Sequence, residues 1–221
     1  MKTPYIYHPE EMFLPSGNWE IKTILDGTVT IIDNFYLNPQ DVVGLAGKLA
    51  YTNHPDFTSA APLLRSVFFG GMKSAEKNLL KSSLVDGGAI MPLHTFNIQT
   101  RGMILEHSLY RCPHLDSNAL NESNEWSLLV YLTHDGVGTT FYEKPTDTTA
   151  CQTIISAPVF MNKWRESATV AGCYNRAILF SSSSCYHKID AANARKMSKK
   201  WRLFQVSTII KNLASIPKLP S

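Results

Sequence analysis

The stretch Leu109-Tyr110-Arg111-Cys112-Pro113-His114-Leu115-Asp116-Ser117 ends an apolar run with a histidine and an aspartate two positions apart. Side chains of a β-strand alternate between its two faces, so a strand here would point His114 and Asp116 to the same side. An imidazole and a carboxylate at that spacing supply two ligands of a metal site. The strands around this stretch must then bring a third ligand to it.

The third ligand that we expect is His187, in Ser184-Cys185-Tyr186-His187-Lys188-Ile189, which lies 71 residues beyond Asp116 at the end of another apolar run. Two imidazoles and one carboxylate leave the opposite positions of a metal open, the facial arrangement typical of non-haem Fe(II) sites. Zinc also accepts these ligands. Taken singly, His187 is better explained as a core histidine that is hydrogen-bonded to the backbone, and the order of the predicted strands is what favours the ligand.

Two further His-x-acid triplets show that the motif alone is weak. They are His8-Pro9-Glu10 and His54-Pro55-Asp56, and the second follows a predicted helix and is typical of a proline turn. Only the triplet His114-Leu115-Asp116 lies at the end of a strand-like run and before several more predicted strands. We therefore assign the metal role to that triplet.

Length and composition indicate one globular domain. The chain has 221 residues, is 44% hydrophobic and carries a formal net charge of +3. Its basic residues are scattered, which argues against nucleic-acid binding. Its four cysteines show no Cys-x-x-Cys spacing, which fits a reducing compartment. With no signal-peptide core and no membrane-length apolar run, we expect a cytoplasmic protein, monomeric or homodimeric, with no membrane partner.

The order of elements divides the chain at about residue 88. Asn38 and Pro39 begin a predicted helix over 39–51, a second helix is predicted over 74–85, and a loop with Arg65 over 52–72. Short strands are predicted over 19–25 and 28–32 and then over 94–101, 103–112, 126–133, 139–143, 158–162, 168–170, 176–181, 186–189 and 201–210. We expect N-terminal strands and helices over 1–88, a β core over 89–210 and a tail over 211–221.

The order of these pieces resembles the double-stranded β-helix of the Fe(II)/2-oxoglutarate-dependent oxygenases, in the prolyl-hydroxylase-like branch. The matching pieces, in order, are Ile31 to Leu37, Tyr110 to Asp116, Leu128 to Thr133, Gly138 to Tyr142, Asn175 to Phe180, Tyr186 to Ile189 and Trp201 to Val206. The resemblance implies a mainly β fold with α, a jelly roll of the cupin kind with N-terminal buttressing helices.

The same resemblance implies the roles of individual residues. His114, Asp116 and His187 correspond to the iron ligands. Arg202 corresponds to the basic residue that binds the distal carboxylate of 2-oxoglutarate, and a guanidinium suits that role because its planar fork pairs both carboxylate oxygens. Tyr110 is placed where the family often has a hydroxyl that assists that carboxylate. Many relatives have a serine two residues after the arginine, where this chain has Phe204.

The implied activity is that of a dioxygenase with the cofactors Fe(II), 2-oxoglutarate and O2. It would hydroxylate a small molecule, such as an amino acid or a biosynthetic intermediate, and release succinate and CO2. Desaturation or oxidative cyclisation needs the same ligands. The alternatives are a catalytically silent β-helix that binds a ligand, a zinc hydrolase with the same ligands, and a plain β-sandwich binding module. Arg195 competes with Arg202 for the carboxylate, but lies in a stretch that is typical of a loop.

Overall fold

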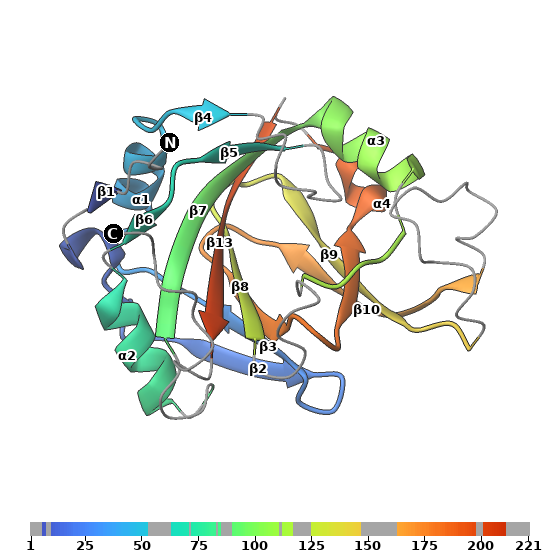
Figure 1. Ribbon diagram of the computed structural model, residues 1–221, viewed down its shortest axis with the longest axis horizontal. Coiled ribbons are helices and arrows are strands. Elements are labelled where there is room, and N and C mark those ends of the chain that lie inside the picture. Colours follow the sequence, from blue (N-terminus) through green and yellow to red (C-terminus); the bar gives the residue numbers. More distant parts are fainter. Residues whose placement is uncertain are drawn as a thin grey trace, which may run out of the picture.

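Two sheets, antiparallel except for the parallel pair β1–β6, face each other in this computed structural model (Figure 1). The structure describes residues 6–7, 10–52, 63–70, 72–82, 84, 90–110, 112–116, 125–146, 163–197 and 201–210. Among these residues the large sheet has ten strands, in the order β1-β6-β7-β13-β8-β11-β3-β2, with β5 paired to β7 and β4 paired to β5. The small sheet has the order β10-β9-β12.

The strands of the large sheet are β1 (Ile6–Tyr7), β2 (Glu20–Ile24), β3 (Val29–Asp33), β4 (Tyr51–Thr52), β5 (Leu64–Ser66), β6 (Phe69–Gly70), β7 (Ile90–Thr100), β8 (Glu125–Tyr131), β11 (Ala177–Ser181) and β13 (Trp201–Ile210). Those of the small sheet are β9 (Gly136–Glu143), β10 (Arg165–Gly172) and β12 (Tyr186–Ile189). The helices are the 3-10 helix η1 (Glu10–Phe13) and α1 (Pro39–Ala46), α2 (Lys73–Lys81), α3 (Arg101–Tyr110) and α4 (Ala191–Ala194).

The inner face of the large sheet packs against the small sheet. Alternation along β8 and β11 turns Tyr131, Ile178 and Phe180 inward, where they meet Phe141 of β9 and Val170 of β10 in one buried cluster. The space between the sheets is therefore a packed interior at this end. The side chains of the predicted metal ligands project into the same interior.

The outer face of the large sheet is covered by α1, α2 and the N-terminal segments, which lie on the side away from β9 and β10 (Figure 1). Pro39 occupies the first turn of α1, and Val42 and Leu45 are buried on the sheet. The predicted extension of α1 to residue 51 is wrong, because Tyr51 pairs as strand β4 with Ser66. The helix prediction over 74–85 is confirmed as α2, somewhat shorter.

Helix α3 replaces the strand predicted over 103–112. The Thr100 hydroxyl oxygen accepts a hydrogen bond from the Met103 backbone N–H at 3.3 Å, which is the bond of a helix N-cap. Ile104 is fully buried against Val137, Ala194 and Met197, so the helix has an apolar anchor. The strand prediction for this segment is wrong because the cap at Thr100 and this packing outweigh its β propensity.

The N-terminal strands extend the large sheet at both ends, since β3 pairs with β11 while β5 and β6 pair with β7. The loop expected over 52–72 is therefore wrong for residues 64–66 and 69–70. The strand predicted over 158–162 and the tail over 211–221 lie outside the described residues. The division at residue 88 stays a prediction. Within the described part of the chain, no helix is long and apolar enough to cross a membrane.

Candidate metal centre

His187 reaches the interior from β12. It is buried, and its ring packs edge-on to Phe180, with 4.7 Å between the ring centroids. Its Nδ1 lies 3.1 Å from the carbonyl oxygen of Cys185. A carbonyl only accepts, so Nδ1 carries the proton and Nε2 keeps its lone pair. The backbone contact therefore fixes both the tautomer and the direction of the ring.

His114 and Asp116 lie on an irregular segment that touches β12 at one point. The backbone N–H of His114 donates to the His187 carbonyl oxygen at 3.0 Å, and that of His187 donates to the His114 carbonyl oxygen at 3.0 Å. This isolated antiparallel bridge places the two histidines side by side. The expected strand is reduced to this single pair, and yet the two ligands of the triplet still point to one side.

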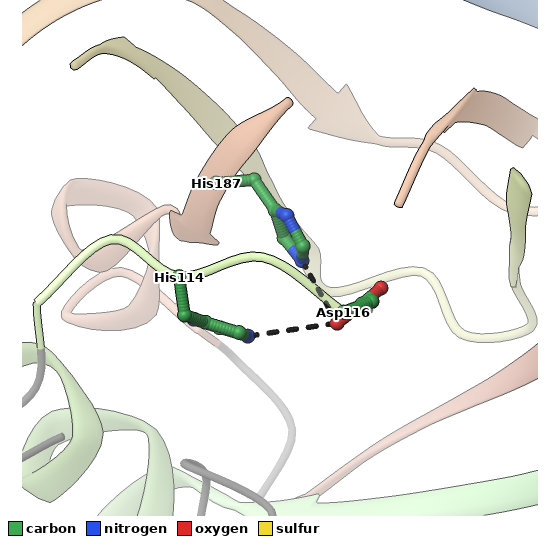
Figure 2. A group of neighbouring side chains, drawn as sticks. All are labelled: His114, Asp116 and His187. Atoms are coloured by element: carbon green, nitrogen blue, oxygen red, sulfur yellow. Dashed lines mark ion pairs between the residues drawn. The ribbon is translucent and has the colours of Figure 1, made fainter. Parts of the chain in front are cut away.

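The three side chains converge on one point (Figure 2). Asp116 Oδ1 lies 3.8 Å from Nε2 of His114 and 3.5 Å from Nε2 of His187. Ligand atoms that share one ion at 2.0–2.2 Å lie roughly 3–4 Å apart, so the spacing fits a single metal ion. The predicted grouping of the three residues is found in the structure, and their role as metal ligands stays a prediction.

The group is buried on the side of His187 and partly exposed to solvent on the side of His114 and Asp116. The His187 side chain is 9% exposed, whereas those of His114 and Asp116 are 28% and 32% exposed. The closed side holds the ligands in place. The open side gives further ligands access to an ion at the group, as a catalytic metal site requires.

The electrostatic environment favours the ligand forms of these residues. Burial lowers the pKa of His114 to about 4, with a further contribution from His187, while Asp116 opposes the shift. Burial raises the pKa of Asp116, but the two histidines, the Ser127 hydrogen bond and Arg65 together lower it below its usual value. At neutral pH His114 is therefore neutral and Asp116 is charged, the states in which both bind metal.

Arg202 lies on the inner face of β13 and is buried. Its Nε donates to Gln99 Oε1 at 3.0 Å, its Nη1 donates to the Val137 carbonyl oxygen at 3.2 Å, and its guanidinium carbon lies 4.5 Å above the ring of Phe204. Among the described residues it forms no ion pair with a carboxylate. Burial lowers its pKa, and Tyr131, Asp135 and Asp190 oppose that shift.

The competing Arg195 is exposed at the C-terminal end of α4, where its carbonyl oxygen accepts a hydrogen bond from the Arg101 side chain. Tyr110 is the last residue of the helix α3, so it does not belong to a strand that continues to His114. Its side chain lies outside the described part of the structure. The role of Tyr110 in binding the 2-oxoglutarate carboxylate therefore stays a prediction.

Two polar residues near the site, Ser127 and Tyr131, are assigned no role by the sequence. The Tyr131 hydroxyl lies 2.8 Å from Thr139 Oγ1, and Tyr131 stands opposite Phe204 in the β8–β13 pairing. The Ser127 hydroxyl donates to Asp116 Oδ2 at 2.7 Å. Alternation along β8 puts both on one face, but only the register with β13 shows that this face is the interior.

Arg65 is a further cation on the inner face, from β5. Its backbone pairs with that of Asn97 on β7, and its Nε donates to Asn97 Oδ1 at 3.1 Å. Its positive charge contributes to the lowered pKa of Asp116. Arg65 and Arg202 are thus each bonded at Nε to an amide oxygen of the same strand.

No family model and no curated protein matches this chain. Solved structures do. An oxidoreductase of the 2OG-Fe(II) oxygenase family from Burkholderia pseudomallei is 11% identical with a TM-score of 0.51, covering 84% of this chain and 86% of that one. HygX from Streptomyces hygroscopicus, solved with nickel and 2-oxoglutarate bound, is 10% identical with a TM-score of 0.54, covering 84% of each chain.

The third structure is the non-heme alpha ketoglutarate dependent epimerase SnoN from nogalamycin biosynthesis. It is 13% identical with a TM-score of 0.52, covering 83% of this chain and 78% of that one. At such identities the likeness establishes the fold. The chain has the jelly-roll fold of the 2OG-Fe(II) oxygenases, and the fold predicted from the sequence resemblance is confirmed.

Proposed function

We propose that this chain is an Fe(II)- and 2-oxoglutarate-dependent oxygenase that hydroxylates an unactivated C–H bond of a small molecule and releases succinate and CO2. The observation that carries the proposal is the convergence of His114, Asp116 and His187 in the interior that also buries Arg202. The fold shared with oxygenases of this class supports it.

The ligand set fits Fe(II). His114 and His187 would bind it through Nε2 and Asp116 through Oδ1, since these are the atoms that converge. Two imidazoles and one carboxylate on one side of an ion form the facial set of non-haem Fe(II) oxygenases. When bound, iron with 2-oxoglutarate and O2 supplies the oxidising chemistry that no protein side chain can provide.

Arg202 is the residue that would bind the distal carboxylate of 2-oxoglutarate. A guanidinium has five N–H donors, and the bonds to Gln99 and Val137 occupy two of them, which leaves three for a ligand. Two parallel N–H bonds to a carboxylate fix both its position and its orientation. The Tyr131 hydroxyl, close enough to affect the pKa of Arg202, would add a further donor to the same carboxylate.

The surrounding side chains exclude water and orient the ligands. Phe141 and Phe180 flank the His187 ring and keep solvent from its buried side. The Cys185 carbonyl oxygen holds the proton on Nδ1 of that ring, so the lone pair on Nε2 stays available. The chain thus contributes binding, orientation and a dry wall on one side of the reaction centre.

The substrate class and the outcome of the reaction belong to the proposal. Proteins with this fold include the epimerase SnoN and the carbocyclase SnoK, both from nogalamycin biosynthesis, so the fold is compatible with several outcomes. The proposed substrate is small, such as an amino acid or a biosynthetic intermediate. Desaturation or oxidative cyclisation remains the alternative outcome.

Two alternatives make different demands on the structure. A catalytically silent binding module would be favoured if the three ligands diverged or Arg202 pointed outward, but the ligands converge and Arg202 is buried. A zinc hydrolase would use the same three ligands but would give Arg202 no task. It would act without oxygen and without 2-oxoglutarate.

The experiment that tests the proposal is conversion of 2-oxoglutarate to succinate by the iron-loaded protein in air, in the presence of a small-molecule library. We expect succinate formation that requires Fe(II) and O2 and is abolished in Asp116→Ala, with circular dichroism unchanged. Asp41→Ala, an exposed acid in the first turn of α1, is the matched control and should keep full turnover. Succinate formation retained in Asp116→Ala would contradict the ligand assignment.

A further inference from the structure

Asp116 is connected to a second, deeper serine through Ser127. The Ser127 hydroxyl lies 2.7 Å from Asp116 Oδ2, and Ser182 Oγ lies 2.9 Å from Ser127 Oγ. The two serines are 4% and 1% exposed. Ser127 belongs to β8, and Ser182 lies in the turn between β11 and β12. Three separate segments therefore meet in one line of polar atoms.

Hydrogen-bonding capacity fixes the direction of this chain. A carboxylate only accepts, and a serine hydroxyl has one proton to donate. Ser127 must give its proton to Asp116, so the Ser127 oxygen can only accept from Ser182. The order is Ser182 to Ser127 to Asp116, and each bond polarises the next.

The two carboxylate oxygens of Asp116 therefore have different partners. Oδ1 faces Nε2 of His114 and Nε2 of His187, whereas Oδ2 faces away and is occupied by Ser127. We propose that Ser127 and Ser182 are positioning residues that hold Asp116 as a one-oxygen metal ligand. This inference rests on the proposed metal site and adds the residues that keep the second carboxylate oxygen off the ion.

When Asp116 binds through one oxygen, one more coordination position of the ion stays open. If Oδ2 were released, the carboxylate could turn and bind the ion through both oxygens, and the position needed by an incoming ligand would be lost. Partners that hold a metal ligand from behind typically change metal affinity about 10- to 100-fold when they are removed. A purely structural pair of serines would alter the stability of the fold and leave metal binding unchanged.

Cobalt(II) titration of the metal-free protein tests the inference without any need for turnover. The visible absorption of Co(II) reports both affinity and coordination number, because added ligands weaken the band. Ser127→Ala should weaken Co(II) affinity about tenfold or more and should reduce the band intensity at saturation. Ser182→Ala should shift both in the same direction by less.

A double-mutant cycle shows whether the two serines act in series. Since Ser182 reaches Asp116 only through Ser127, the double variant should match Ser127→Ala, and Ser182→Ala should have no effect in that background. Ser183→Ala is the matched control, because this serine of the same turn pairs with Ser181 and stays outside the chain of bonds. Circular dichroism and the melting temperature of the metal-free variants check the fold.

The outcomes separate this inference from the function it rests on. If His114→Ala abolishes Co(II) binding while Ser127→Ala binds as tightly as wild type with an unchanged band, the positioning role is overturned and the metal site stands. If wild-type protein binds no Co(II) at these residues, the metal site fails and the positioning role fails with it. An effect of Ser182→Ala that persists without the Ser127 hydroxyl would overturn the serial order.

Discussion

The guanidinium of Arg202 is held by two neutral oxygens and an aromatic ring, which fix its orientation without neutralising its charge. Burying a charge without a paired anion is unfavourable. Such an arrangement is expected where a ligand brings the anion. The residue is therefore the part of the site that distinguishes a 2-oxoglutarate enzyme from a plain metal hydrolase with the same three ligands.

Replacing Arg202 with lysine keeps the charge but removes the planar fork and the bonds to Gln99 and Val137. We expect the affinity for 2-oxoglutarate to fall about 10- to 100-fold, since a hydrogen bond to a charged group contributes roughly 1.5–3 kcal/mol. Calorimetric titration of the anaerobic metal-loaded protein measures it. Arg195→Lys should bind like wild type. An unchanged affinity in Arg202→Lys, with a loss in Arg195→Lys, would move the carboxylate site to Arg195.

The sequence was sufficient to predict which three side chains converge, and their role as metal ligands stays a prediction. Two residues of spacing put His114 and Asp116 on one side, and an apolar run led to His187. Ser127 and Tyr131 carry no such signal. Their positions depend on which strand pairs with β8 and on which face of the sheet is buried. The sequence of one strand does not determine either, because both depend on residues that are distant in sequence.

At the scale of the elements, β9 and β10 approach so closely that two glycines are required. A Cβ at Gly138 would overlap the carbonyl oxygen of Val170, and one at Gly172 would overlap that of Val137. Gly138 lies between Val137, whose carbonyl oxygen binds Arg202, and Thr139, whose hydroxyl meets Tyr131. Any displacement of this strand would therefore reach the proposed carboxylate site.

Gly138→Ala should lower the free energy of unfolding by about 2 kcal/mol or more, because overpacking at a close backbone contact forces the strands apart. Gly44→Ala is the matched control. Its added methyl would meet nothing within 4 Å, and within α1 it should raise stability by about 0.5–1 kcal/mol. Urea unfolding followed by circular dichroism compares the two. Equal effects of the two substitutions would contradict the close approach of β9 and β10.

Element prediction succeeded where the hydrophobic pattern was bounded by clear breaks. The bounds predicted for Tyr186–Ile189 and Trp201–Ile210 agree with β12 and β13. It failed at α3, where strands were predicted over 94–101 and 103–112 and the capping role of Thr100 was not recognised. Apolar residues over 103–110 fit either period, so the packing of Ile104 on α4 decides the outcome.

At the scale of the whole molecule, the proposed metal centre joins segments that are distant in sequence. His114 and Asp116 are carried by the segment after α3, His187 by the small sheet, and the supporting Ser127 by the large sheet. An ion bound by the first three would therefore cross-link the segment after α3 to the small sheet, and the hydrogen bond from Ser127 to Asp116 ties this segment to the large sheet. Metal binding and folding stability should be coupled.

Metal at about 100 times its dissociation constant should stabilise the folded protein by about 2.7 kcal/mol. For a chain of this length, this corresponds to a rise in melting temperature of about 5–10 °C. Scanning calorimetry with Co(II), and again after chelation, measures the rise and its reversal. His187→Ala should lose the rise, whereas His134→Ala, an exposed histidine outside the group, should keep it. A rise of equal size in His187→Ala would place the ion elsewhere.

The central claim is that one site binds both Fe(II) and 2-oxoglutarate, and anaerobic visible absorption tests it most directly. Metal-free protein is titrated with Fe(II) and then with 2-oxoglutarate, and the weak charge-transfer band of the chelated complex is recorded. We predict a stoichiometric band that disappears in His114→Ala and that needs a higher 2-oxoglutarate concentration in Arg202→Lys. If folded protein that starts free of iron gives no band after both additions, the claim is contradicted. A silent binding module or a zinc enzyme would then be favoured.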